Sequence, residues 1–194
     1  MRNIVVCIAL VAFFFTLAFG RPVRVIGVLD GDTVRLDDGE LVRLVGIDTP
    51  ERGESLYVEA RDLLEHLIVN REAELEFDYT RRDHYKRLLG YLWLGDTLVN
   101  RYIVANGFAR VYAWPPDTLH FRSMLDAQTD ARHKKLGIWS LPLPEPESLY
   151  VIHATKYRFH RPSCGSVKRK DTRTPLSRDS LLSLGFAPCR TCKP

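Results

Sequence analysis

Cysteine is scarce in this chain of 194 residues, and internal repeats and low-complexity segments are absent from it. Of its four cysteines, Cys7 lies in an apolar segment at the N-terminus. The other three (Cys164, Cys189 and Cys192) are an odd number, which argues against a framework made only of disulfides. Hydrophobic residues make up 45% and charged residues 27% of the chain, as is typical of a globular protein. The length suits one well-buried domain with a small appendage.

Long apolar runs are also lacking, except at the N-terminus. Arg2 precedes an uncharged apolar run from Ile4 to Phe19, and Ala18-Phe19-Gly20 comes directly before Arg21. This layout predicts a signal peptide over residues 1–20, and therefore a secreted or periplasmic protein. The run is slightly shorter than the roughly 20 residues of a membrane span. A retained membrane anchor is the alternative, and no lipidation motif precedes a cysteine.

Acidic residues become rare toward the C-terminus. Residues 150–194 carry ten Lys or Arg against two acids, a net charge of +8, whereas residues 21–149 carry 17 against 22, a net charge of −5. Three prolines lie between these parts, in residues 141–149. We therefore expect a main domain over residues 21–140, a proline-rich linker over 141–149 and a basic module over 150–194.

The main domain is expected to be mainly β with α. Short runs rich in Val, Leu and Ile predict five strands, and apolar stripes of helical period predict three helices, the first of them between the third and fourth strands. This order suits a small closed β-barrel of the OB type. The predicted strands are residues 23–29, 33–36, 41–47, 73–79 and 87–95, and the helices are 56–70, 98–106 and about 119–136.

Charged side chains interrupt the first β-rich stretch. If Asp38-Gly39 forms a two-residue hairpin loop, Val34 faces Arg43, and Arg43 stands diagonal to Asp32 within reach of its carboxylate. Because side chains alternate along a strand, Asp48 and Arg43 would point to opposite faces if the strand continued straight. Asp48 can join the pair only if the strand bends or ends, and both Gly46 and Thr49-Pro50 offer such a break.

Two carboxylates that converge at one end of a barrel repel one another unless a cation lies between them. Asp32 and Asp48 then predict a hard divalent ion with oxygen ligands, Ca²⁺ for preference, which leaves Arg43 free to bind a phosphate. The alternative is that these acids are turn residues and that Arg43 forms a surface salt bridge.

Five motifs occur together in the main domain: "DGDTV", "RLVGIDTPE", "DHYKRLLGY", "NGFARVY" and "LGIWS". In this order they resemble the thermonuclease family, whose members have the staphylococcal-nuclease-like domain. The resemblance covers about Val25 to Ser140. It implies a five-stranded OB-type barrel with three helices and a Ca²⁺-dependent endonuclease that hydrolyses the phosphodiester bonds of DNA and RNA with little sequence specificity.

The resemblance also implies roles for individual residues. Asp32 and Asp48 match carboxylate ligands of calcium, Thr49 matches a residue that gives its backbone carbonyl, and Asp30 matches an acid behind these ligands. Glu51 matches the acid that activates or orients the attacking water, Arg43 and Arg87 match the arginines that clamp the phosphate, and Tyr85 and Tyr112 match tyrosines near the nucleotide. Two features depart from the family: Lys86 precedes Arg87, where glycine is frequent, and the hairpin at Asp38-Gly39 is tighter.

The C-terminal module has a separate motif. His160-x3-Cys164 is followed after 24 residues by Cys189-x2-Cys192, and four N and S ligands in two close pairs predict a closed tetrahedral Zn²⁺ site. So small a module with few apolar residues would need such a staple to fold. The segment resembles the metal-binding domain of the Ada DNA-repair protein, with His160 in place of one cysteine. The alternative is a Cys189–Cys192 disulfide with Cys164 free.

Together these features predict an exported, Ca²⁺-dependent nuclease with a zinc-stapled basic module, acting on DNA and RNA and without a stable protein partner. One alternative is a non-catalytic OB module that binds single strands or a protein. Degenerate copies of this kind lose acids or arginines, and this chain keeps Asp32, Arg43, Asp48, Glu51 and Arg87. Another is a regulatory DNA-binding protein led by the zinc module, which the signal peptide disfavours. The basic residues of the module would contact phosphates, or would only surround the zinc site, or would meet a protein or an anionic envelope.

Overall fold

The computed structural model of the chain describes residues 20–194, so the predicted signal peptide lies outside the described residues except for Gly20. Within the described part, no helix is both long enough and apolar enough to cross a membrane. The first part of the chain forms β1 (Arg21–Asp30), β2 (Thr33–Leu36), β3 (Leu41–Leu44), β4 (Ile47–Asp48), α1 (Tyr57–Ile68), β5 (Glu72–Glu76), β6 (Leu88–Leu94), β7 (Thr97–Leu98), α2 (Val99–Ala105), β8 (Arg110–Val111), α3 (Phe121–His133) and η1 (Gly137–Trp139). The second part forms β9 (Tyr150–His153), η2 (Ala154–Lys156), β10 (Arg158–His160), β11 (Thr172–Thr174), α4 (Arg178–Ser183) and β12 (Ala187–Pro188).

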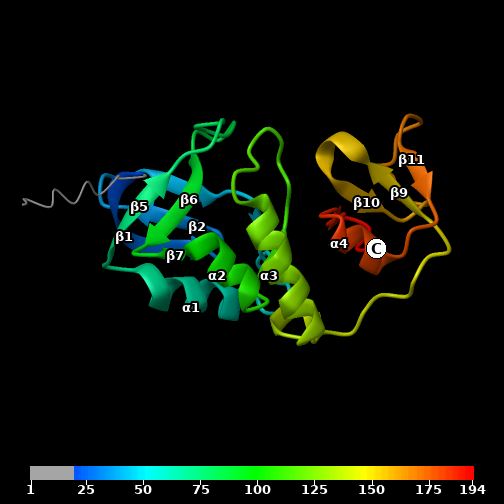
Figure 1. Ribbon diagram of the computed structural model, residues 1–194, viewed down its shortest axis with the longest axis horizontal. Coiled ribbons are helices and arrows are strands. Elements are labelled where there is room, and N and C mark those ends of the chain that lie inside the picture. The colour runs from blue at the N-terminus through cyan, green and yellow to red at the C-terminus, as the bar shows by residue number, and fades with distance from the viewer. Residues whose placement is uncertain (1–19) are drawn as a thin grey trace, which may run out of the picture.

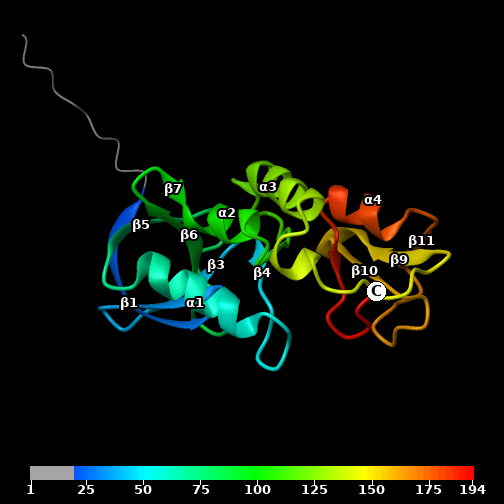
Figure 2. The ribbon, with the colours of Figure 1, turned by 90° about the horizontal axis from the view of Figure 1, so that it is seen from below.

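The predicted barrel is confirmed. Strands β3, β2, β1, β5 and β6 are hydrogen-bonded in that order, and a parallel pairing of β3 with β6 closes the sheet on itself. Closure leaves no free edge between these strands, and the inward side chains make one apolar core. Helix α1 lies along the outside of the barrel, and α2 and α3 pack together at one end of it (Figure 1; Figure 2).

The prediction for the first hairpin is wrong by one residue. Leu36 donates its N–H to the carbonyl of Glu40 over 2.9 Å, so three residues form the loop instead of two. Gly39 has φ +85°, and the Asp38 carboxylate accepts a hydrogen bond from the N–H of Glu40 at 3.0 Å, an arrangement that favours the wider loop. As a result Val34 pairs with Val42, and Arg43 pairs with Thr33.

The predicted bend after the third strand is confirmed at Gly46. The strand expected over residues 41–47 ends at Leu44, Gly46 has φ +79°, and β4 then pairs with β8 instead of continuing the barrel. A side chain at Gly46 would also collide with Met124 of α3. In a straight strand, the side chain of Asp48 would point to the face opposite that of Arg43. The bend removes this restriction.

Asn100 of α2 holds this bend in place. Its side chain is fully buried, its Nδ2 donates to the carbonyl of Val45 at 2.8 Å, and its Oδ1 accepts from the N–H of Leu92 at 3.1 Å.

We expect Asn100→Ala to lower the free energy of unfolding by about 2 kcal/mol or more, because both backbone groups would be left buried without a partner. Urea denaturation checks this. Asn106→Ala, which removes one bond to the carbonyl of Tyr102 that water can replace, is the matched control and should cost less than about 1 kcal/mol. Equal losses in the two variants would contradict the role of Asn100.

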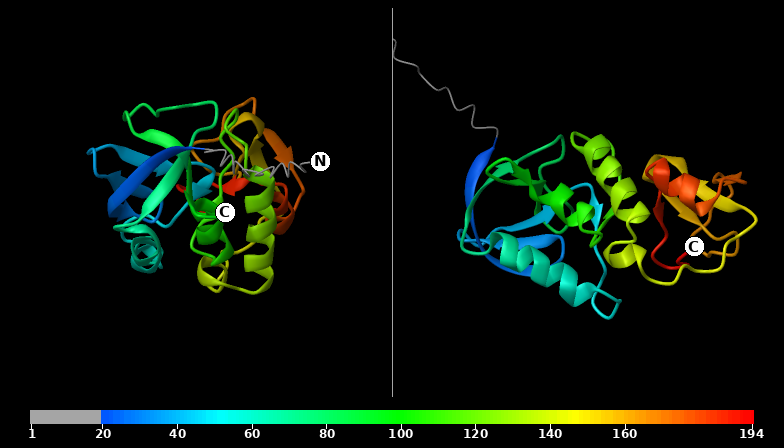
Figure 3. Two further views of the ribbon diagram at one scale, coloured as in Figure 1. Left: turned by 60° about the vertical axis from the view of Figure 1, so that its left-hand side comes forward. Right: turned by 60° about the horizontal axis from the view of Figure 1, so that its bottom comes forward.

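The C-terminal part forms its own sheet, in the order β11-β9-β10-β12, with α4 beside it. Helix α3 lies between this sheet and the barrel (Figure 1; Figure 3). Residues 141–149 join the two parts without forming a helix or strand. The parts nevertheless share an apolar core, which contains Ala131, Ile138, Trp139, Tyr150, Phe159, Leu181 and Leu182. We call this set the shared core. It fixes the C-terminal module against the face of the main domain where β4 and β8 lie.

Candidate active site

The predicted calcium ligands lie together where β2 begins and β4 ends. Asp32, Asp48 and Thr49 are each only 5% exposed. One carboxylate oxygen of Asp32, Oδ2, accepts hydrogen bonds from the N–H of Thr49 at 3.3 Å and from its hydroxyl at 3.1 Å. Behind them, the carboxylate of Asp30 accepts a hydrogen bond from the N–H of Asp32 at 3.2 Å. The bend at Gly46 is what brings acids from the two strands to one place.

Burial dominates the electrostatics of Asp32. It raises the pKa of this carboxyl to about 6, although the positive charge of Arg43 acts in the opposite direction. The charged form of Asp32 is therefore costly in this environment, and additional positive charge would stabilise it.

Arg43 is held tightly against the acidic cluster. Its Nη2 lies 2.8 Å from Oδ2 of Asp32 and donates to the carbonyl of Ile47 at 3.0 Å, and its Nη1 donates to the carbonyl of Leu44. The one-residue change in the hairpin register thus leaves the predicted contact between Arg43 and Asp32 intact. These bonds fix the orientation of the guanidinium at the edge of the site.

Arg87 reaches the same region from the start of β6. Its Nε lies 2.8 Å from Oδ2 of Asp83, and its Nη1 lies 3.5 Å from the hydroxyl of Thr33, next to Asp32. The preceding residue, Lys86, has φ +70°, a conformation that glycine adopts at little cost, so lysine here keeps the backbone course that glycine would give. Asp83 orients Arg87 through Nε, and Nη1 then faces the hydroxyl of Thr33 at the site.

The two arginines line one cavity of about 430 Å³. Tyr112 and Trp114 lie on its wall and stack edge to face, with ring centroids 5.7 Å apart. Trp114 was not among the residues predicted from the sequence. Tyr85 does not line this cavity: it is 69% exposed and lies beside Arg87, whose guanidinium carbon is 5.4 Å from its ring centroid. The structure therefore brings Tyr112, but not Tyr85, into the cavity with both arginines.

Two cations of the C-terminal module enter the site and were not predicted. Arg190 pairs with Asp48 and with Glu51, whose side chain is half exposed. The guanidinium carbon of Arg158 lies 4.1 Å from the ring centroid of Tyr112, and its Nη2 is 3.8 Å from Oδ2 of Asp48. No sequence pattern indicated this, because Arg190 and Asp48 are 142 residues apart.

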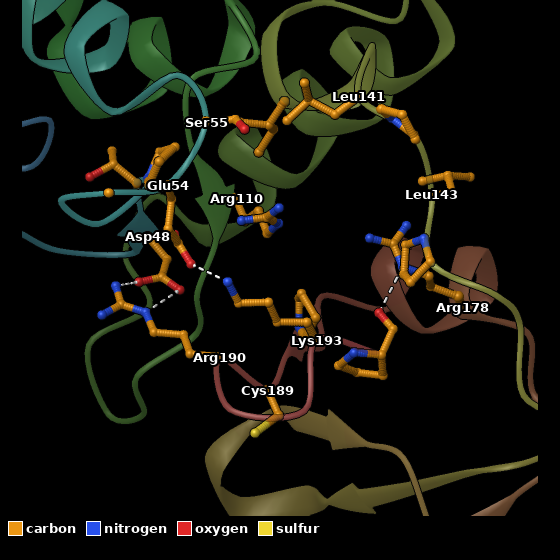
Figure 4. A pocket seen from close by; sticks show the side chains of 18 residues that line it. Asp48, Glu54, Ser55, Arg110, Leu141, Leu143, Arg178, Cys189, Arg190 and Lys193 are labelled. Atoms are coloured by element: carbon orange, nitrogen blue, oxygen red, sulfur yellow. Dashed lines mark hydrogen bonds and ion pairs between the residues drawn. The ribbon is translucent and has the colours of Figure 1, made fainter.

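A second cavity, of about 490 Å³, lies between the two parts of the chain (Figure 4). Asp48 and Glu54 line it from the main domain, and Arg190 and Lys193 line it from the C-terminal module. Lys193 lies 2.9 Å from Glu54, next to the pair that Arg190 makes with Asp48. Two adjacent ion pairs thus connect the last residues of the chain to the acidic cluster.

The four predicted zinc ligands also converge. Donor atoms of His160, Cys164, Cys189 and Cys192 all lie within 4.8 Å of one another, and the three thiols are free. His160 is 6% exposed, and its Nδ1 is buried without a hydrogen-bond partner among the described residues. Three sulfur donors and an unpaired ring nitrogen are a donor set that suits Zn²⁺.

The remaining basic residues of the module divide into two groups. The exposed group consists of Lys156, Lys168, Arg169, Lys170 and Arg173. In contrast, Arg161 pairs with Glu147, and Arg178 donates to the carbonyl of Pro194 at 3.0 Å. Some of the expected phosphate-binding cations are thus engaged inside the protein.

Comparisons of the sequence with known proteins find relatives among nucleases. A family model described as "Staphylococcal nuclease homologue" matches residues 41–141. The thermonuclease of Staphylococcus intermedius is 36% identical over 129 residues, which are 62% of this chain and 77% of that protein. The thermonuclease of Staphylococcus hyicus is 34% identical over 126 residues (60% and 75%), and an uncharacterized endonuclease of Escherichia coli is 34% identical over 128 residues (63% and 80%). The matched range of the family model includes Arg43, Asp48, Glu51 and Arg87 but not residues 150–194.

Proposed function

The chain belongs to the staphylococcal nuclease homologue family, and from this we propose that it is a Ca²⁺-dependent endonuclease that hydrolyses phosphodiester bonds of DNA and RNA. The observation that carries the proposal is the position of Arg43 and Arg87 on one cavity directly beside the buried acids Asp32 and Asp48. A phosphodiester that enters this cavity would meet two guanidinium groups, one of which contacts Asp32 of the proposed cation site.

The residues at the acidic cluster suit a hard divalent cation. The carboxylates of Asp32 and Asp48, with the carbonyl of Thr49, would hold it, because Ca²⁺ prefers oxygen donors. The burial that raises the pKa of Asp32 supports the assignment, since a cation there would compensate the desolvated charge. When bound, the ion supplies positive charge next to the phosphate, where negative charge grows as the bond to phosphorus is broken.

The two arginines would bind the non-bridging phosphate oxygens. Guanidinium groups make bidentate bonds to phosphates, and their contribution is largest where the donors are already oriented. Asp83 orients Arg87, and the carbonyls of Leu44 and Ile47 orient Arg43. Neither arginine then needs to be ordered when the transition state forms.

Glu51 is proposed to orient or deprotonate the attacking water. Its N–H donates to the carboxylate of Glu54 at 3.0 Å, which steadies the loop, while its own side chain remains half exposed and able to contact water. A carboxylate within hydrogen-bond reach of the water is sufficient for this role.

The C-terminal module is proposed to hold a structural Zn²⁺ through His160, Cys164, Cys189 and Cys192. All four positions of a tetrahedral site would then be filled by the protein, which is typical of structural zinc. Export remains a proposal that rests on the sequence of residues 1–20.

The proposed function is tested by digestion of plasmid DNA and of single-stranded RNA with the purified, zinc-loaded chain. We expect cleavage of both in Ca²⁺, background rates in a Ca²⁺ chelator with low zinc affinity, and full recovery when Ca²⁺ is added back, because the cation supplies much of the transition-state stabilisation. Asp48→Asn should remain inactive at every Ca²⁺ concentration tested. Glu72→Gln, at an exposed position on β5, is the control and should behave as the wild type. A protein that binds nucleic acid under all conditions but never cleaves it would contradict the proposal and favour a non-catalytic binding module.

A further inference from the structure

Arg190 covers the acids that the proposed cation site needs. Its Nε donates to Oδ2 of Asp48 at 3.2 Å, and its Nη2 pairs with Oδ1 of the same carboxylate (Figure 4). Its Nη1 pairs with Glu51. Both oxygens of Asp48 are therefore occupied by one guanidinium in the fork-like geometry that makes arginine–carboxylate pairs strong.

This pair lies in a partly water-excluded place. The side chain of Asp48 is only 6% exposed, so its attraction to a nearby cation is screened much less than at the surface. A divalent ion bound to Asp48 would share these oxygens with Arg190, and its charge would repel the guanidinium. Each cation therefore weakens the contacts that the other makes with Asp48.

The backbone of Arg190 is held in position independently of its side chain. Residue 190 lies between Cys189 and Cys192, in the loop that the proposed zinc site would clasp. The N–H of Cys189 donates to the carbonyl of Phe159, a member of the shared core, and the N–H of Lys193 donates to the carbonyl of Cys189, both at 2.9 Å. The guanidinium is thus presented to Asp48 at a high effective concentration.

We propose that Arg190 is an active-site residue that competes with the divalent cation for Asp48 and Glu51, so that the C-terminal module sets the cation affinity of the nuclease site. This inference rests on the proposed function, because it assigns Asp48 to the cation. It adds a residue outside the range matched by the family model.

The test is the direct binding of Ca²⁺ to the zinc-loaded full chain, measured by isothermal titration calorimetry without substrate. We expect Arg190→Ala and Arg190→Gln to bind Ca²⁺ about tenfold more tightly than the wild type, because a partly buried competing charge is removed. Arg190→Lys keeps the charge but cannot bind both oxygens, and should lie between. The Ca²⁺ concentration for half-maximal cleavage should shift in the same order.

Arg169→Ala is the matched control, since it removes one positive charge from an exposed position of the same module. It should leave the Kd of Ca²⁺ within about twofold of the wild type, because exposed charges at a distance are largely screened. Zinc content and far-UV circular dichroism verify that each variant is folded. Glutamine keeps much of the length and polarity of the side chain, and therefore serves if alanine disturbs the loop.

The outcomes distinguish the proposed competition by Arg190 from the proposed cation site of the nuclease. Equal Ca²⁺ affinity in the wild type, Arg190→Gln and Arg169→Ala, or weaker binding in Arg190→Gln, would overturn the competition while leaving the nuclease intact. Tight binding in Arg190→Gln with weak binding in the wild type supports it. If none of the proteins binds Ca²⁺ and none requires it for cleavage, the proposed cation site itself is wrong.

Discussion

Replacing both Arg43 and Arg87 with alanine should lower kcat by about 10⁴-fold or more, and each single replacement should cost about 10² to 10³. The reason is that each guanidinium is already oriented beside the same cavity, Arg43 by backbone carbonyls and Arg87 by Asp83. Such donors stabilise the transition state without reorganising, so their loss affects the chemical step more than substrate binding.

The measurement is kcat on long DNA at saturating Ca²⁺, with the thermal midpoint of each variant as a check on folding. Arg101→Ala, at an exposed position on α2, serves as the control and should be unchanged. Lysine at position 87 should recover only part of the rate, because it keeps the charge but not the bidentate geometry. A wild-type kcat in the double variant would contradict the catalytic role of these arginines.

Removing zinc from the proposed site at His160, Cys164, Cys189 and Cys192 should reduce the free energy of unfolding of the full chain by more than about 4 kcal/mol. Without the metal the three thiols and His160 have nothing to bridge them, and the small C-terminal sheet would lose its staple. Because that sheet contributes Tyr150 and Phe159 to the shared core, we expect the loss to extend to α3 and to lower the thermal midpoint of the whole chain.

Differential scanning calorimetry before and after a zinc-selective chelator measures this, with zinc content determined in parallel. Cys164→Ser should reproduce the effect of the chelator. Ser166→Ala, an exposed change two residues away, should melt as the wild type does. A purified protein with no zinc and a Cys189–Cys192 disulfide would instead support the alternative drawn from the sequence.

Local patterns were sufficient for most of the barrel. Alternating apolar residues and helical stripes predicted its strands and helices to within a few residues, and Gly46 correctly marked the bend after which Thr49 contacts Asp32. The hairpin loop was misjudged because Asp38-Gly39 is compatible with two loop lengths. The choice between them depends on hydrogen bonds to the neighbouring residues Leu36 and Glu40.

Contacts between residues far apart in the sequence could not be predicted from local sequence patterns. Arg158 and Arg190 entered the sequence analysis only through the count of basic residues in the module, and such a count does not tell which face of a small sheet meets the barrel. Their partners Tyr112 and Asp48 follow from the docking of the module through the shared core. Trp114 was missed for a related reason: it follows the recognised motif that ends at Tyr112, and only the folded loop places it on the cavity wall.

The shared core has a consequence for biosynthesis. A ribosome delivers the barrel and α3 first, and Leu181 and Leu182 emerge about 50 residues after Ala131. During that interval Ile138 and Trp139 lack the apolar side chains that finally cover them, and newly made chains with such exposed surfaces associate readily. Translation that stops short of α4 would therefore release a polypeptide prone to self-association, although every strand of the barrel had already been made.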